Sequence, residues 1–165
     1  DPDNLPDTVE VSPADPDLED PEYVYDAGIQ VNSGDLEGAK IIYNSNEPVT
    51  PRLGPTGEIP SLAGARGIPM NLQPSIVFNT PVKIFIPYPG RRDVSHLHVH
   101  LYNGTRWVRA CDNKGNVRPG GDGWMVPGSR VDHNSRIPPT VEIKVYHFSA
   151  VQVKPDSSHQ ALGSV

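Results

Sequence analysis

The chain lacks the features that would place it in several large classes of protein. It has one cysteine, Cys111, so a disulfide within the chain is excluded. No apolar run approaches the roughly 20 residues that a transmembrane helix needs, so we expect no membrane span. Lys and Arg number 14 against 20 for Asp and Glu, and no basic stripe offsets the acid. Nucleic acid is therefore not an expected partner.

What the chain does contain is an unusual number of residues that end regular structure. Pro occurs 19 times and Gly 15 times among 165 residues, without the period of collagen. Such punctuation favours short strands joined by turns and argues against long helices. The length suits one domain with a core of its own. We therefore predict an all-β fold, an antiparallel β-sandwich of short strands with an extended acidic N-terminal arm.

The pattern along the chain divides it into three parts. Residues 1–21 are acidic and rich in Pro, which is typical of an extended arm or linker. A calcium-binding or strand-donating role is the alternative for this arm, although its carboxylates lack the Gly spacing of a calcium loop. Residues 22–153 alternate in the manner of strands and form the predicted β-sandwich domain, and residues 154–165 form a C-terminal tail.

A strand is predicted between Pro81 and Pro87, which bracket it. Val82, Ile84 and Ile86 share one face, whereas Lys83 and Phe85 share the other. Because successive side chains of a strand point to opposite sides, the first set is predicted to face the core.

A hairpin is predicted around Asn103-Gly104, a preferred pair for a two-residue turn. This turn would pair Tyr102 with Thr105 and align the alternating residues of 96–110 on two faces.

The same pairing places three histidines on one strand face, with Cys111 opposite His96. His96, His98 and Cys111 are the most compact set of zinc or copper ligands on this face, because His96 and His100 are about 13 Å apart along a strand. The alternative is an ordinary sheet face on which the histidines pack beside other amphipathic side chains.

The tripeptide His147-Phe148-Ser149 carries the most chemistry. It follows a predicted final strand over 140–147 that can continue through 153. In a strand, His147 and Ser149 would share the apolar stripe of the preceding residues. If the strand bends there, the Ser149 hydroxyl can attack the Phe148 carbonyl while the His147 imidazole takes its proton. The alternative is a satisfied core histidine beside an inert strand serine.

The residues YHFSAVQ (146–152) resemble the scissile site of self-processing β-sandwich modules. These include ZU-five-type domains, function-to-find domains and, in the logic of a His two positions before a Ser or Thr, GAIN domains. The segment IPMNLQPSIVFNTPVKIFIPYPG (68–90) is similar to the ZU-five pattern of a Pro-marked turn before a strand. With LYNGTRWV (101–108) and GWMVPGSRV (123–131), residues 57–153 look like a module of bacterial or archaeal surface proteins.

This resemblance implies a role for each residue of the tripeptide. Ser149 would be the nucleophile, His147 the base and Phe148 the carbonyl donor, in one turnover of autoproteolysis without a cofactor. We therefore expect an extracellular or cell-surface module whose fragments stay associated and whose partners are neighbouring domains or a surface partner. A non-cleaving structural, adhesive or fibre-forming module, with or without a metal at the histidine face, is the alternative. The sequence sets no oligomeric state.

Overall fold

The computed structural model describes residues 7–55, 59–90 and 92–155. Its elements are almost all strands in antiparallel sheets, which confirms the predicted all-β fold. In chain order they are β1 (Thr8–Glu10), η2 (Pro16–Leu18), β2 (Ala27–Val31), β3 (Lys40–Tyr43), β4 (Arg52–Leu53), β5 (Leu72–Gln73), β6 (Val77–Pro87), β7 (Leu97–Tyr102), β8 (Trp107–Cys111), η3 (Pro119–Gly121), β9 (Val131–His133), β10 (Thr140–His147) and β11 (Ala150–Pro155).

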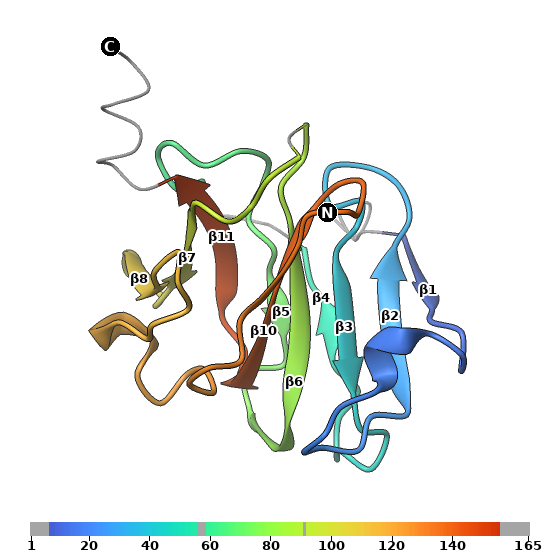
Figure 1. Ribbon diagram of the computed structural model, residues 1–165. Coiled ribbons are helices and arrows are strands. Elements are labelled where there is room, and N and C mark those ends of the chain that lie inside the picture. Colours follow the sequence, from blue (N-terminus) through green and yellow to red (C-terminus); the bar gives the residue numbers. More distant parts are fainter. Residues whose placement is uncertain (1–6, 56–58, 91, 156–165) are drawn as a thin grey trace.

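Two sheets form the sandwich (Figure 1). The larger has six strands in the order β1-β2-β3-β6-β10-β9, and the smaller has three in the order β11-β7-β8. A separate two-stranded ribbon joins β4 to β5. The long central strand β6 pairs with β3 on one side and with β10 on the other, so it holds the larger sheet together.

The alternation predicted for β6 is confirmed. Val82, Ile84 and Ile86 belong to the core between the two sheets, whereas Phe85 belongs to a second apolar cluster on the outer face. Lys83 is also buried on that outer side, which means that both faces of β6 are covered.

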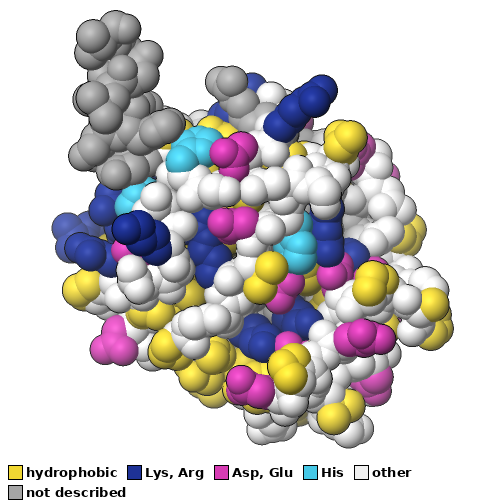
Figure 2. Space-filling view, viewed as in Figure 1, with side chains coloured by type: hydrophobic (Ala, Val, Ile, Leu, Met, Phe, Trp, Pro, Cys, Tyr) yellow, Lys and Arg dark blue, Asp and Glu magenta, His cyan; other side chains and the backbone are white. Residues whose placement is uncertain are grey.

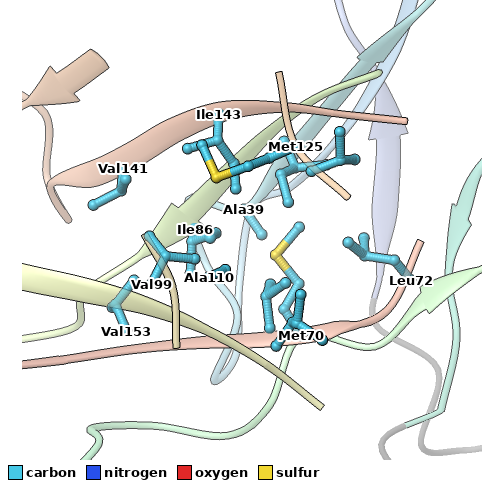
Figure 3. Close-up of a cluster of buried hydrophobic side chains, with 14 of the residues drawn as sticks. Ala39, Met70, Leu72, Ile86, Val99, Ala110, Met125, Val141, Ile143 and Val153 are labelled. Carbon is cyan, nitrogen blue, oxygen red and sulfur yellow. The ribbon is translucent and has the colours of Figure 1, made fainter. Parts of the chain in front are cut away.

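The main core is assembled from side chains of both sheets and of the loops. Figure 3 shows Val141 and Ile143 of β10 and Val99 and Val153 of the smaller sheet pointing into one shared interior. Met70, whose backbone bridges to β11, fills the space between the layers. Unbranched Met suits such a position because it adapts to irregular gaps.

The N-terminal residues do not stand apart from the sandwich. Residues 8–10, in the segment predicted as an arm or linker, form β1 at the edge of the larger sheet. Part of the segment before residue 22 is therefore paired with the larger sheet. Residues 1–6 lie outside the described part, and so does most of the predicted tail at 154–165, of which only Lys154 and Pro155 are described, at the end of β11.

The surface in the view of Figure 2 mixes acidic and basic side chains. In the described ranges, the structure has no helix with the length and apolar character of a membrane span.

Candidate functional site

The predicted cleavage tripeptide lies where the chain passes from one sheet to the other. His147 is the last residue of β10, and Phe148-Ser149 form the whole connection to β11. The two strands run in opposite directions, so the chain reverses within these two residues (Figure 1). The predicted strand at 140–147 is confirmed, but its continuation through residue 153 is wrong because β11 belongs to the other sheet.

The pairing of β10 with β6 becomes irregular just before this reversal. The pairing of β10 with β6 shifts between Val145 and His147. From Val145 to His147 the chain advances two positions on β10, whereas the partner positions on β6 run from Val82 to Val77, so the regular alternation is interrupted here. Phe148 is the next residue after Val145 that belongs to the main core. His147 and Ser149 are partly buried, as expected, but they do not continue the fully buried row of Val141, Ile143 and Val145.

Phe148 anchors the connection in the core. Its side chain is 2% exposed, and its ring centroid lies 4.7 Å from that of Phe78 with the planes tilted by 58°. Tilted aromatic pairs at this separation are favourable beyond the area they bury. The side chain of Phe148 thus holds the connection in place. His147 and Ser149, on either side of it, are half-buried.

The chemistry open to these groups follows from their positions. The Ser149 hydroxyl is one residue beyond the Phe148 carbonyl, so attack closes a small ring without any movement of distant groups. The peptide between them is trans, and neither residue has a positive φ. Among the described residues, no hydrogen bond joins the His147 imidazole to the Ser149 hydroxyl.

The hairpin of the smaller sheet has a different register from the predicted one. Tyr102 pairs with Trp107, not with Thr105. The carboxamide oxygen of Asn103 accepts hydrogen bonds from the backbone N–H groups of Thr105 and Arg106, both at 2.9 Å. This side-chain turn competes with the tight two-residue turn that the Asn-Gly pair predicts.

The register change separates Cys111 from the histidines. A further irregularity between Val99 and His100 places Cys111 opposite Val99 rather than opposite His96. Cys111 is fully buried in the core, and burial raises the pKa of its thiol. The structure therefore does not bring His96, His98 and Cys111 together as a set of metal ligands.

The histidines of β7 lie in a covered layer. His98 and His100 are 4% and 6% exposed, although they point away from the main core. His100 lies between Gln152 of β11 and Arg109 of β8. Burial, followed by the charges of Lys154 and Arg109, lowers the pKa of His100 to about 4. The imidazole of His100 is consequently neutral at pH 7.

One group of potential metal ligands does occur in the described residues. Asp17, His133 and Glu142 bring a ligand atom each within 4.8 Å of one another. Asp17 is already bonded to Lys40 at 2.7 Å and to both terminal nitrogens of Arg136, and His133 is 2.8 Å from Glu142. The two cations on Asp17 oppose the entry of a divalent ion, so we interpret the group as a salt-bridge network.

This network was missed at the sequence level, although part of the signal was present. Lys83 was predicted on the face of its strand opposite the core, but the sequence did not indicate which residues would pair with it. Lys83 pairs with Asp20 of the acidic segment. Lys40, on the neighbouring strand, pairs with Asp15 and Asp17 of the same segment. A charged side chain on the outer face of a central strand is the signal that something must cover and neutralise that face.

Comparisons with family models, with curated proteins and with solved structures gave no significant match. The resemblance of residues 57–153 to self-processing modules thus stays a prediction, and the function is argued from the geometry of this chain.

Proposed function

We propose that the protein is a self-processing β-sandwich module that cuts its own backbone once, between Phe148 and Ser149. The observation that carries the proposal is the position of this bond in a two-residue reversal between the sheets. The connection is pinned by the buried ring of Phe148, and its His and Ser are half-buried beside it. A short, fixed reversal limits the freedom of the peptide and keeps nucleophile, carbonyl and base in one place.

The proposed reaction has two steps. The Ser149 oxygen bonds to the Phe148 carbonyl carbon, the carbon–nitrogen bond breaks, and His147 carries the hydroxyl proton to the departing amine. The product is an ester between Phe148 and Ser149. Water then adds to the ester, which leaves a carboxylate on Phe148 and restores the hydroxyl of Ser149. Atoms balance with water as the only co-reactant.

The fragments are expected to stay together. β11 pairs with β7 from Ala150–Tyr102 to Pro155–Leu97, and on its other side Val151 exchanges two backbone hydrogen bonds of 3.0 Å with Met70. These contacts do not depend on the covalent link at Phe148. A cut would therefore be invisible in a native size measurement.

Intact mass under denaturing conditions tests the proposal. The full chain should yield fragments 1–148 and 149–165 on incubation at neutral pH, and Ser149→Ala should give one uncut mass. Because a general base contributes about 10²–10⁴-fold, His147→Ala should slow the cut by at least about 100-fold. Ser149→Thr, which keeps a hydroxyl, should still cut, and Ser95→Ala is the matched control. A single uncut mass for the unaltered chain would contradict the proposal.

A second candidate function is a non-cleaving adhesive module. Ile137 is 97% exposed and lines a hollow of about 570 Å³ between the loops that follow β2, β6 and β9. Exposed apolar side chains beside a concave surface favour contact with a partner. The mass measurement separates the two, since an adhesive module keeps one uncut chain.

A further inference from the structure

The outer face of the larger sheet carries a group of cations in an unusual setting. Lys40 of β3, Lys83 of β6 and Lys144 of β10 lie on this face, and Arg136 reaches it from the loop before β10. We call these four side chains the basic face. Two of them lie over the fully buried ring of Phe85, with Lys40 at 5.6 Å and Arg136 at 5.3 Å from its centroid.

Residues 7–26, here called the arm, contain no Lys or Arg, and the part of the arm from Asp15 to Tyr25 contacts the basic face. Asp17 is 2.7 Å from Lys40 and 2.7 Å from Arg136. Asp20 is 2.7 Å from Lys144 and 3.5 Å from Lys83. The blue segment in Figure 1 is this arm.

Carbonyl groups of the arm complete the neutralisation. The ammonium group of Lys83 donates hydrogen bonds to the carbonyl oxygens of Asp17 at 2.9 Å and of Glu19 at 2.8 Å. Each cation of the basic face thus has a defined acceptor on the arm. Such complete pairing is what a buried charge requires.

Aromatic rings are interleaved with the charges. Lys144 lies 5.3 Å from the ring centroid of Tyr23, and Lys83 lies 5.1 Å from that of Tyr25. Phe85 in turn has Lys40 at 5.6 Å. Cations within about 6 Å of a ring face are attracted to it. The face therefore recognises both the acidic and the aromatic side chains of the segment that lies on it.

The middle of the arm depends on side chains for its attachment. Among the described residues, backbone pairing of the arm with the sheet is confined to its ends: β1 on β2, the Val11 N–H to the Gly28 carbonyl at 3.0 Å, and the Asp26 N–H to the Tyr43 carbonyl at 3.3 Å. Salt screens contacts between charges, and a competing segment could replace side-chain contacts without breaking a sheet ladder.

We propose that the basic face is a binding surface for an acidic, tyrosine-containing segment of a partner protein, and that the arm occupies it in cis as a displaceable competitor. The arm shows the chemistry that fits: carboxylates spaced as Asp15, Asp17 and Asp20, followed by tyrosines. A tethered competitor acts at a high effective concentration, so a partner must bind well or the arm must first be weakened. This inference does not rest on self-cleavage.

The probe is a fluorescent peptide of residues 7–26, added to the full chain. The variant Asp15→Asn/Asp17→Asn/Asp20→Asn weakens the arm in cis, and its full chain should bind the peptide at least tenfold more tightly than the unaltered chain. Asp35→Asn, which removes an exposed acid elsewhere, should bind as the unaltered chain does. A peptide with the same three Asp→Asn changes should lose binding at least tenfold, and 1 M salt should weaken the unaltered peptide strongly.

A second measurement avoids any altered chain. Excess peptide should speed hydrogen exchange of the Leu18 and Glu19 amides in the unaltered protein, because their own arm is displaced. If the triple variant proves unfolded by near-ultraviolet circular dichroism, this measurement decides. The proposal is overturned if the peptide neither binds the variant more tightly nor speeds exchange. It is equally overturned if polyphosphate, which has no aromatic ring, competes as well as the peptide does.

Discussion

At the scale of single residues, Phe148 has the largest consequence for the site. The sequence placed His147 and Ser149 on the apolar row of a regular strand. The pairing of β10 with β6 becomes irregular between Val145 and His147, and Phe148 is the fully buried residue beyond that point. Alternation can be counted from a sequence, whereas such an irregularity depends on the neighbouring strand and leaves no local signal. The strand before the tripeptide was therefore predictable, and the orientation of its last side chains was not.

Phe148→Ala should lower the free energy of unfolding by about 3–5 kcal/mol, because a buried ring in contact with Phe78 is replaced by a cavity. Chemical denaturation measures the loss. Val77→Ala is the control: Val77 pairs with His147 but is 73% exposed, and its truncation should cost no more than about 0.5 kcal/mol. Equal losses in the two variants would show that Phe148 is not an anchor.

At the scale of elements, the smaller sheet owes its covered outer side to a loop. Residues 59–67 lie over β11 and β8: the Trp107 indole donates to the Pro60 carbonyl at 2.8 Å, and Gln152 reaches the same segment. This cover explains why β7 is buried on both faces, with histidines on one of them. The sequence predicted the two strands of the hairpin, but a loop without alternation gave no indication of where it packs.

The side chain of Gln152 makes hydrogen bonds that hold the loop at 59–67 on the smaller sheet. Its side chain accepts a hydrogen bond from the Leu62 N–H at 2.7 Å and donates one to the Gly67 carbonyl at 3.1 Å. Gln152→Leu should cost about 1–3 kcal/mol, because two buried backbone groups lose their partners. Hydrogen exchange at Leu62 should accelerate. Ser61→Ala, which removes only contacts of 3.4 Å and 3.3 Å with the Gln152 side chain, should change exchange at Leu62 little. A larger effect would show that Ser61 rather than Gln152 holds the loop in place.

At the scale of the whole molecule, charge is distributed as two covered layers outside the main core. One is the arm on the basic face, and the other is the histidine layer of β7. The composition shows the acidic stretch, but the partners of its carboxylates lie far along the chain, as in the pair of Asp20 with Lys144 of β10. Pairings of this range depend on the completed fold, which is why the sequence did not disclose them.

The pH dependence of stability should show both layers. His100 has a folded pKa of about 4, below its ordinary value of 6.5, so the unfolded chain takes up the proton first and stability falls as pH falls from about 6.5 to about 4. This difference between the folded and unfolded chain is worth a few kcal/mol, on the order of 3. Burial alone would raise the pKa of Asp17 and of Asp20, but hydrogen bonds from Arg136 and Lys40 to Asp17 and from Lys144 to Asp20 lower each to about 2. Their contribution is present above about 3.8 and is lost as pH falls through 2.

Urea unfolding at a series of pH values measures this profile. His100→Gln should flatten the decline between pH 6.5 and 4. Asp17→Asn should leave that decline in place and reduce the further loss below pH 4. If the His100 variant keeps the full decline, a titratable group other than His100 causes the loss of stability between pH 6.5 and 4.

The reversal at Phe148-Ser149 also governs how the molecule would respond to mechanical load. A pull outward on Pro155 parts β11 from β7 one pair at a time, beginning at Leu97 and ending at Tyr102. With the backbone intact, the force then reaches the ring of Phe148 and is passed into the larger sheet. With the backbone cut, only the two hydrogen bonds of Val151 with Met70 and the packing of β11 remain, and the strand comes away once these break. The same two residues thus decide whether tension stretches this domain or detaches its last strand.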